Sequence, residues 1–228
     1  QRAQIQQEMA GKSMVFGNCC AGGGGEYNEE LVVEESKYVG DFKDGKRHGK
    51  GTQYNQDGSR YEGRWENDEK SHGTYFYKDD SRYVGEFKNG KPDGQGILYY
   101  DNVDYYDGNF KNGKPNGQGT LFYEDGSKYV GDFKDGTRHG KGILTYRDGG
   151  RRYEGLWLRD FPAHYGTLYY PLQGEQGKEY TPIKYEGLWY KGVPHGKGTL
   201  YDENGVIKHE GFFSFDDWDG GQYFSDDW

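Results

Sequence analysis

Residues 38–51 read YVGDFKDGKRHGKG, and variants of this stretch recur along most of the 228-residue chain. The motif Tyr-x-Gly-x-aromatic returns every 22 to 24 residues, except for one interval of 32 residues. In five of these copies a Gly-x-Gly pair follows, 11 and 13 residues after the tyrosine. A fixed period of this length is the signature of a repeat protein. The eight copies, numbered one to eight below, begin near residues 38, 61, 83, 106, 129, 153, 185 and 209.

Each copy predicts one β-hairpin. The Tyr, Gly and aromatic positions of the motif alternate, so in a strand they would share one face. The polar stretch Lys43–His48 would then form a turn, and Gly49 and Gly51 would belong to a second strand. A second turn signal, such as Asp57-Gly58, closes the copy, and Asp-Gly between alternating runs is a strong hairpin cue.

The composition agrees with a repeat of aromatic hairpins. Glycine accounts for 40 residues and tyrosine for 23, while only 32% of the chain is hydrophobic. A repeated glycine inside a strand needs compensation, which an aromatic ring lying over the bare backbone would supply. We therefore expect a core of stacked rings rather than of aliphatic side chains. The aromatic content argues against disorder, and no run of apolar residues approaches the length of a membrane-spanning helix.

The motif resembles the MORN repeat (membrane occupation and recognition nexus), and residues 38–51 carry the closest match. The resemblance covers residues 38 to about 222, and it implies an all-β fold. We expect an elongated, twisted, single-layer antiparallel ribbon of about eight stacked β-hairpins. The predicted organisation is an N-terminal extension with a Gly-rich linker at 1–37, the array at 38–212, and an acidic-aromatic cap or tail at 213–228.

Catalytic, cofactor and metal sites are not predicted. The Gly45–Thr52 stretch resembles a phosphate-binding loop, but it has the wrong spacing and leads into a strand. His48, His139 and His195 recur with the repeat, at separations too long for one metal ion to bridge. The net charge of −9 argues against nucleic acid as a partner.

The function that the resemblance implies is a non-catalytic scaffold for protein–protein interaction. Proteins built almost wholly of MORN repeats are often cytoskeletal, and some resemble ciliary radial-spoke heads. We therefore expect a cytoplasmic, cytoskeletal protein of a multi-subunit complex, in the axoneme of a cilium or flagellum, with self-association also open. The expected partner-binding residues are surface rings of the array and of the tail: Tyr61, Trp65, Tyr106, Tyr129, Trp157, Trp189, Phe213, Phe215, Trp218 and Trp228.

The main alternative is a membrane-associated module that binds anionic lipid. The turns inside the hairpins are basic and would line one edge of the ribbon, where cations could meet anionic lipid or protect the edge from aggregation. Two further alternatives are the accessory array of an enzyme and a carbohydrate-binding aromatic stripe. The predicted basic edge contains Lys43, Lys46, Arg47, Lys50, Lys88, Lys91, Lys111, Lys114, Lys134, Arg138 and Lys141.

Three irregular segments carry their own alternatives. Cys19 and Cys20 are adjacent, which predicts no disulfide framework; they are either plain thiols or sites of palmitoylation. The Pro171–Lys184 insertion is either a tolerated loop or a partner-binding one. The Phe213–Trp228 segment is either a capping hairpin or a docking segment with aromatic anchors.

Overall fold

The structure is a computed structural model that describes residues 36–100, 103–170 and 183–214. All of these residues belong to one unit, Val32–Trp228. They contain fifteen β-strands and no helix. The strands are β1 (Lys37–Lys43), β2 (Lys46–Tyr54), β3 (Arg60–Glu66), β4 (Glu69–Phe76), β5 (Arg82–Lys88), β6 (Lys91–Tyr99), β7 (Tyr105–Lys111), β8 (Lys114–Phe122), β9 (Lys128–Lys134), β10 (Thr137–Thr145), β11 (Arg151–Leu158), β12 (Phe161–Tyr170), β13 (Ile183–Tyr190), β14 (Val193–Tyr201) and β15 (Ile207–Phe213).

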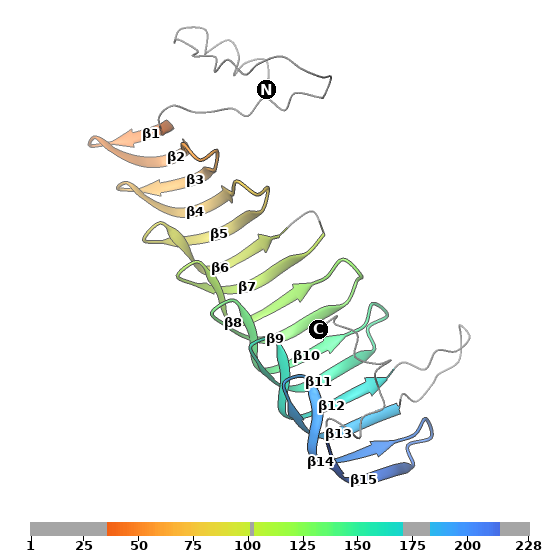
Figure 1. The fold of residues 1–228 in the computed structure, drawn as a ribbon. Coiled ribbons are helices and arrows are strands. Elements are labelled where there is room, and N and C mark those ends of the chain that lie inside the picture. Colours follow the sequence, from red (N-terminus) through yellow and green to blue (C-terminus); the bar gives the residue numbers. More distant parts are fainter. Residues whose placement is uncertain (1–35, 101–102, 171–182, 215–228) are drawn as a thin grey trace, which may run out of the picture. The chain divides into compact units, whose positions relative to one another are not determined.

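The strands form one antiparallel sheet in which the spatial order follows the chain order from β1 to β15 (Figure 1). Copies one to seven each supply two strands, and the eighth supplies β15. The prediction of an all-β, single-layer ribbon of stacked hairpins is confirmed. The sheet reaches Phe213. Residues 1–35 and 215–228, which make up most of the two predicted end segments, lie outside the described residues, as do residues 171–182 of the insertion.

The turn inside each hairpin is shorter than the sequence analysis predicted. Lys43 and Lys46 are paired across the hairpin, so only Asp44 and Gly45 form the loop, and the predicted turn Lys43–His48 is wrong in its bounds. Both loop residues have positive φ, 51° and 76°. Two such residues form a type I′ turn, whose twist matches that of the strands it joins. The polar residues around it therefore belong to the paired strands.

A bulge explains the Gly-x-Gly pair. In the first hairpin Gly40 pairs with Gly51 and Phe42 pairs with Arg47, so Asp41 faces three residues of β2. Gly49 lies in this bulge at φ 72°, which is a left-handed conformation that glycine adopts without strain. The carboxylate of Asp41 accepts a hydrogen bond of 3.0 Å from the Lys50 amide and so fixes the bulge.

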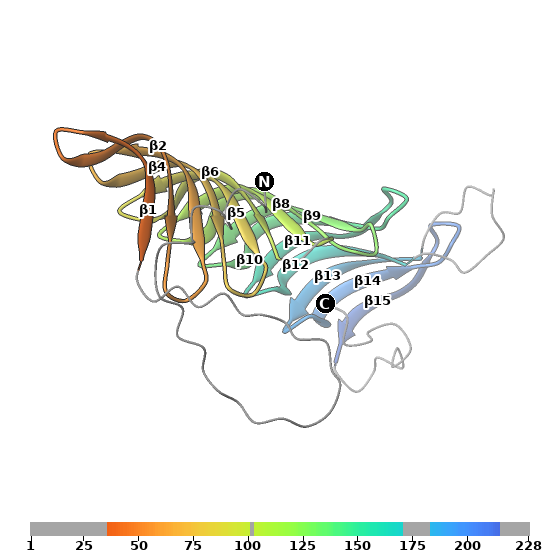
Figure 2. The same cartoon turned by 90° about the horizontal axis from the view of Figure 1, so that it is seen from above.

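The core is a continuous row of aromatic rings on one face of the sheet, as the sequence predicted. Each motif tyrosine packs edge-on against the aromatic residue of its own copy and against that of the next copy. Tyr106, for example, lies 5.1 Å from Phe110 and 4.7 Å from Phe133, measured between ring centroids. The strands curve (Figure 2), and the motif tyrosines from Tyr61 to Tyr185 are completely buried.

Backbone groups hold each ring in place. The hydroxyl of Tyr106 donates a 2.9 Å hydrogen bond to the Asn109 carbonyl, and its ring lies over Gly108 and Gly119. Where the second aromatic residue is tryptophan, its indole N–H bonds a carbonyl of the preceding hairpin, as from Trp157 to Gly142 at 3.2 Å. Each copy is thus bonded within itself and to its neighbour.

The residue nine positions after each motif tyrosine covers the ring row from the turn side. It is Arg, Lys or Pro in every hairpin, and its carbonyl usually accepts a hydrogen bond from the turn of the next hairpin, as from Gly113 to Pro92 at 2.8 Å. Arg138 reaches further, since its guanidinium donates to the Asp160 carbonyl at 2.9 Å and lies 4.4 Å from the centroid of Trp157. The turns are therefore linked from copy to copy.

Candidate interaction surface

The array rings that the sequence analysis assigned to partner binding are not on the surface. Tyr61, Tyr106, Tyr129, Trp65, Trp157, Trp189 and Phe213 are all between 0 and 6% exposed. The expectation of surface rings is therefore wrong, because these rings lie over the motif glycines and are covered along their edges. Phe215, Trp218 and Trp228 lie outside the described residues, so their role in binding stays a prediction.

Burial also changes the acid–base chemistry of the tyrosines. Removal from water disfavours the phenolate and raises the pKa of Tyr61 to about 12. The same cause raises the pKa of the other buried motif tyrosines: Tyr83, Tyr106, Tyr129, Tyr153 and Tyr185.

The predicted basic edge divides into three groups. Arg47 and Arg138 are wrong assignments, because both cover the ring row and each bonds an aspartate in the next turn, Asp68 and Asp160 respectively. Lys50 and Lys141 project from the sheet face opposite the rings. The remaining lysines are exposed beside the type I′ turns: Lys43, Lys46, Lys88, Lys91, Lys111, Lys114 and Lys134.

The surface available for binding is therefore the face opposite the rings, which we call the open face. It carries the residues that alternate with the tyrosine, glycine and aromatic positions of the motif. Its central row crosses all fifteen strands and contains Val39, Thr52, Glu62, Thr74, Val84, Ile97, Asp107, Thr120, Val130, Ile143, Glu154, Thr167, Glu186, Thr199 and Glu210.

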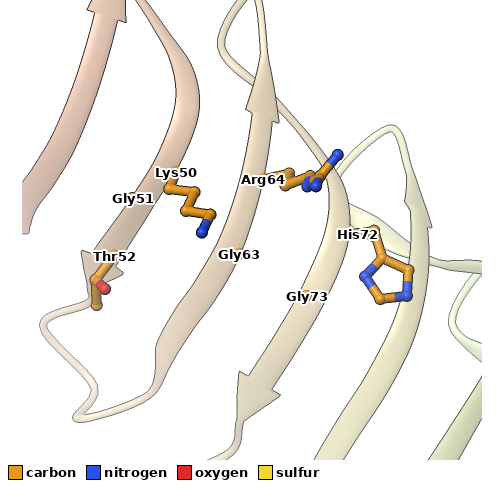
Figure 3. A pocket seen from close by; sticks show the side chains of 7 residues that line it. All are labelled: Lys50, Gly51, Thr52, Gly63, Arg64, His72 and Gly73. Carbon is orange, nitrogen blue, oxygen red and sulfur yellow. The ribbon is translucent and has the colours of Figure 1, made fainter.

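A shallow, basic depression lies on the open face over β2, β3 and β4 (Figure 3). It has a volume of about 450 Å³, and Lys50, Arg64 and His72 come to it from three neighbouring strands. Lys50 and Arg64 are direct cross-strand partners, an arrangement of like charges that is unfavourable by itself. In copies three to five this row instead holds paired polar groups, such as Gln95 and Asn109 at 2.6 Å.

Cations stack on aromatic rings at several places along a third row of the open face, nearer the loops that join the hairpins. The guanidinium of Arg60 lies 3.7 Å from the Phe76 centroid, and that of Arg82 lies 4.2 Å from the Tyr99 centroid. Lys184 makes the same contact at 4.3 Å with Tyr201. Such stacked cation–aromatic pairs are half-buried and border the open face on the side of the loops.

An exposed apolar patch occupies the open face over β11 to β15. The position after the motif glycine is polar or charged in copies one to five, but it is Leu156, Leu188 and Phe212 in copies six to eight. The residues two positions further on change in the same way, from Lys or Glu to Leu158 and Tyr190. With Tyr165, which pairs with Leu188, these six residues form what we call the apolar patch.

The described part of the chain holds neither a cluster of side chains for a metal ion nor a helix that could span a membrane. Across residues 36–100, 103–170 and 183–214, no group of three or more His, Cys, Asp or Glu side chains could hold a metal ion. The same residues contain no helix long and apolar enough to cross a membrane.

Comparison with known protein families identifies the repeats of the array. The MORN-repeat family matches residues 38–60, 61–82, 83–102, 106–128, 129–151 and 185–207, which together are more than half of the chain. The chain therefore belongs to the MORN-repeat family. No curated protein matches the sequence.

The sixth hairpin, β11–β12, is structurally equivalent to the others although the family match omits it. Its sequence has His164 in place of the first glycine of the Gly-x-Gly pair, and His164 adopts the same left-handed conformation with φ 59°. The fold thus tolerates the loss of one signature residue.

Membership defines the general role of the chain. MORN arrays are repeat structures that bind proteins or membranes, and a stacked β-scaffold of this kind is generally not an enzyme. The rings of the motif form the core of the array, and the residues that alternate with them lie on the open face.

The sequence analysis missed the open face because it considered only the motif positions. The signal was nevertheless in the sequence. Residues at motif positions are nearly constant, whereas the alternating positions change from charged to apolar between Asp132 and Leu156. The constant positions identify the core, and the variable ones identify the open face.

Proposed function

We propose that this protein is a non-catalytic scaffold that binds other proteins through its open face. The observation that carries the proposal is the difference between the two faces of the sheet. One face is filled by its own rings, while the other presents a continuous row of outward side chains across fifteen strands. Such an extended one-sided surface is typical of repeat proteins that hold several partners.

The setting that we propose is a cytoskeletal assembly in the cytoplasm, and specifically the axoneme of a cilium or flagellum. The support is analogy with proteins built mainly from MORN repeats, such as radial-spoke heads, and it concerns the family rather than this chain. A multi-subunit assembly would use the length of the array, because partners could bind along separate hairpins.

The test is quantitative capture of cytoskeletal proteins by three forms of the full chain. The open-face variant Thr120→Arg/Val130→Arg places two charges in the central row, and Glu124→Arg is a control at an exposed loop position. We expect the wild type and the control to capture the same axonemal set, and the open-face variant to lose it. Equal capture by all three forms would contradict the proposal.

A second candidate function, binding to anionic lipid, is favoured by one observation. Lys43/Lys46, Lys88/Lys91 and Lys111/Lys114 are three exposed cross-strand pairs at the same edge of the sheet. Each pair flanks a type I′ turn, so six ammonium groups project from copies one, three and four, while the equivalent pair of copy two is Glu66 and Glu69. Clustered lysines attract anionic membranes by about 1 kcal/mol each.

Vesicle flotation tests this candidate. Binding to phosphoinositide vesicles that weakens with salt, and that is lost in Lys88→Glu/Lys111→Glu, would support it. The same charge change at Lys37 and Lys128, which lie away from these turns, is the control. No flotation of the wild type would exclude the edge as a lipid site.

A further inference from the structure

The apolar patch differs from the equivalent part of the open face in the earlier copies. Phe212, Tyr165 and Tyr190 are 73, 57 and 53% exposed, and Leu158 and Leu188 are also exposed. Contiguous exposed apolar groups mark an interaction surface. The motif does not require them, because copies one to five hold polar residues at the same positions.

The charges around the patch favour an acidic occupant. Lys141 pairs with Leu156 at one end of the patch, and Lys197 pairs with Phe212 at the other end. Lys191 follows Tyr190 at the turn, with its ammonium 5.3 Å from the tyrosine ring.

Carboxylates also adjoin the patch, in the central row of the open face. Two of them are already paired, Glu154 with Arg151 at 2.6 Å and Glu186 with Lys184 at 2.8 Å. Glu210 is the third. The lysines at the ends of the patch therefore dominate the field over its apolar residues.

A segment with matching chemistry follows directly from β15. Residues 215–228 read FDDWDGGQYFSDDW, with five aromatic residues, five aspartates and no lysine or arginine. Aromatic side chains suit the apolar patch, and the aspartates suit the lysines beside it.

The segment is long enough to cover the patch. The distance from β15 to β11 is four strand spacings, about 19 Å. Fourteen extended residues span up to about 46 Å. Because the segment is tethered beside Phe212, its effective concentration at the patch is on the order of millimolar, which favours it over a separate partner.

We propose that residues 215–228 dock onto the apolar patch of the same chain, with aromatic side chains against Leu188, Tyr190 and their neighbours and with aspartates near Lys141, Lys191 and Lys197. The occupant is an internal one. It covers the apolar end of the open face and leaves copies one to five free for other partners. Displacement of the segment would expose a second binding surface, with a preference for acidic, aromatic peptides.

The test is photo-crosslinking in the full chain, with benzoylphenylalanine in place of Tyr223. On irradiation of dilute protein we expect a monomeric product whose cross-links map to β11–β15. Leu188→Glu/Tyr190→Glu places two carboxylates in the patch and should lower the yield of this product about tenfold. Val39→Glu, an exposed apolar position at the other end of the open face, is the matched control and should leave the yield unchanged.

Other outcomes would overturn the proposal. Cross-links mainly between two chains would assign the patch to the segment of a second copy. Cross-links to other parts of the array, or equal yields from the patch variant and the control, would show that the segment does not occupy the patch. Thermal unfolding of each variant, followed by circular dichroism, separates loss of docking from loss of folding.

Discussion

A tyrosine lying over two glycines is the smallest unit that determines this fold. Gly108 and Gly119 are cross-strand partners, and the Tyr106 ring covers both of them. The ring is completely buried although the sheet has one layer, since the missing side chains leave a trough for it. This is why glycine is frequent in strands, where it is otherwise unfavourable.

We predict that Gly119→Ala destabilises the array by about 1–3 kcal/mol, because the added methyl group overpacks the trough. A Cβ at Gly119 would lie less than 3.0 Å from the Tyr106 ring, closer than real side chains approach. The measurement is the midpoint of thermal or urea unfolding. Gly150→Ala is the control, since Gly150 has no positive φ and meets only the end of the Asp148 side chain at 3.1 Å. Equal midpoints for the two variants would refute the trough argument.

Within the hairpin, the bulge depends on one left-handed residue. Five hairpins have glycine at this position, whereas the sixth has His164. A left-handed conformation costs a residue with a side chain about 1–2 kcal/mol. Glycine adopts this conformation without strain, although it also raises the conformational entropy of the unfolded chain, which offsets part of the gain.

We therefore predict that His164→Gly stabilises the protein by about 0.5–1 kcal/mol. His72→Gly makes the same change at an exposed histidine of β4 with ordinary φ, and it should destabilise by about 0.5–1 kcal/mol. Chemical denaturation of the two variants checks the opposite signs. If both variants lose stability, the backbone at residue 164 is not the source of strain.

Between hairpins, the turn chemistry is matched from copy to copy. Arg47 and Arg138 each face a turn whose second residue is aspartate, Asp68 and Asp160. Prolines at the same position face glycine instead, in the pairs Pro92–Gly113, Pro115–Gly136 and Pro162–Gly192. An arginine needs the carboxylate, while a proline offers only its carbonyl to the turn amide.

We predict that Arg138→Pro alone is strongly destabilising and that Arg138→Pro/Asp160→Gly recovers much of the loss. The single change removes two hydrogen bonds to the Asp160 carboxylate, one from the Arg138 amide at 2.8 Å and one from its guanidinium at 3.2 Å. The double change recreates the Pro–Gly pair of neighbouring copies. The coupling free energy from a double-mutant cycle should be about 1–3 kcal/mol. Additive effects would show that the two positions are independent.

At the scale of the whole molecule, the sequence predicts the scaffold better than the site. The repeat period, the alternation of Tyr38, Gly40 and Phe42, and the glycine content were enough to predict a single-layer array with a ring core. The same data could not assign Arg138, because whether a basic residue near a turn faces water or a ring depends on the bulge. The bulge changes which residues share a face.

The site was harder to predict because a one-layer sheet has two faces and the motif occupies one. Trp65 and Trp157 resemble binding residues in sequence, yet both are completely covered. The docking surface depends on residues that vary between copies, such as Leu188 and Phe212. A motif is defined by the positions that stay constant between copies, so it contains no information about these residues.

The continuous ring row gives the molecule one collective property, a sharp response to alkaline pH. Burial raises the pKa of Tyr61 from an ordinary value of 10.0 to about 12, and it raises those of the other buried motif tyrosines. The unfolded chain therefore loses phenol protons at lower pH than the folded chain does. Their contribution to stability is fully present below pH 10 and is lost as the pH rises through 12 and above.

We predict that the buried motif tyrosines ionise only as the sheet unfolds, near pH 12 or above. Tyrosinate absorbance and far-ultraviolet circular dichroism, followed on one sample, should therefore change together in this alkaline step. Because each motif tyrosine contacts the aromatic residue of the next copy, ionisation of one ring weakens its neighbours, so this step should be steeper than a single-group titration. Ionisation of every tyrosine near pH 10 with the sheet preserved would mean that the ring row is open to water.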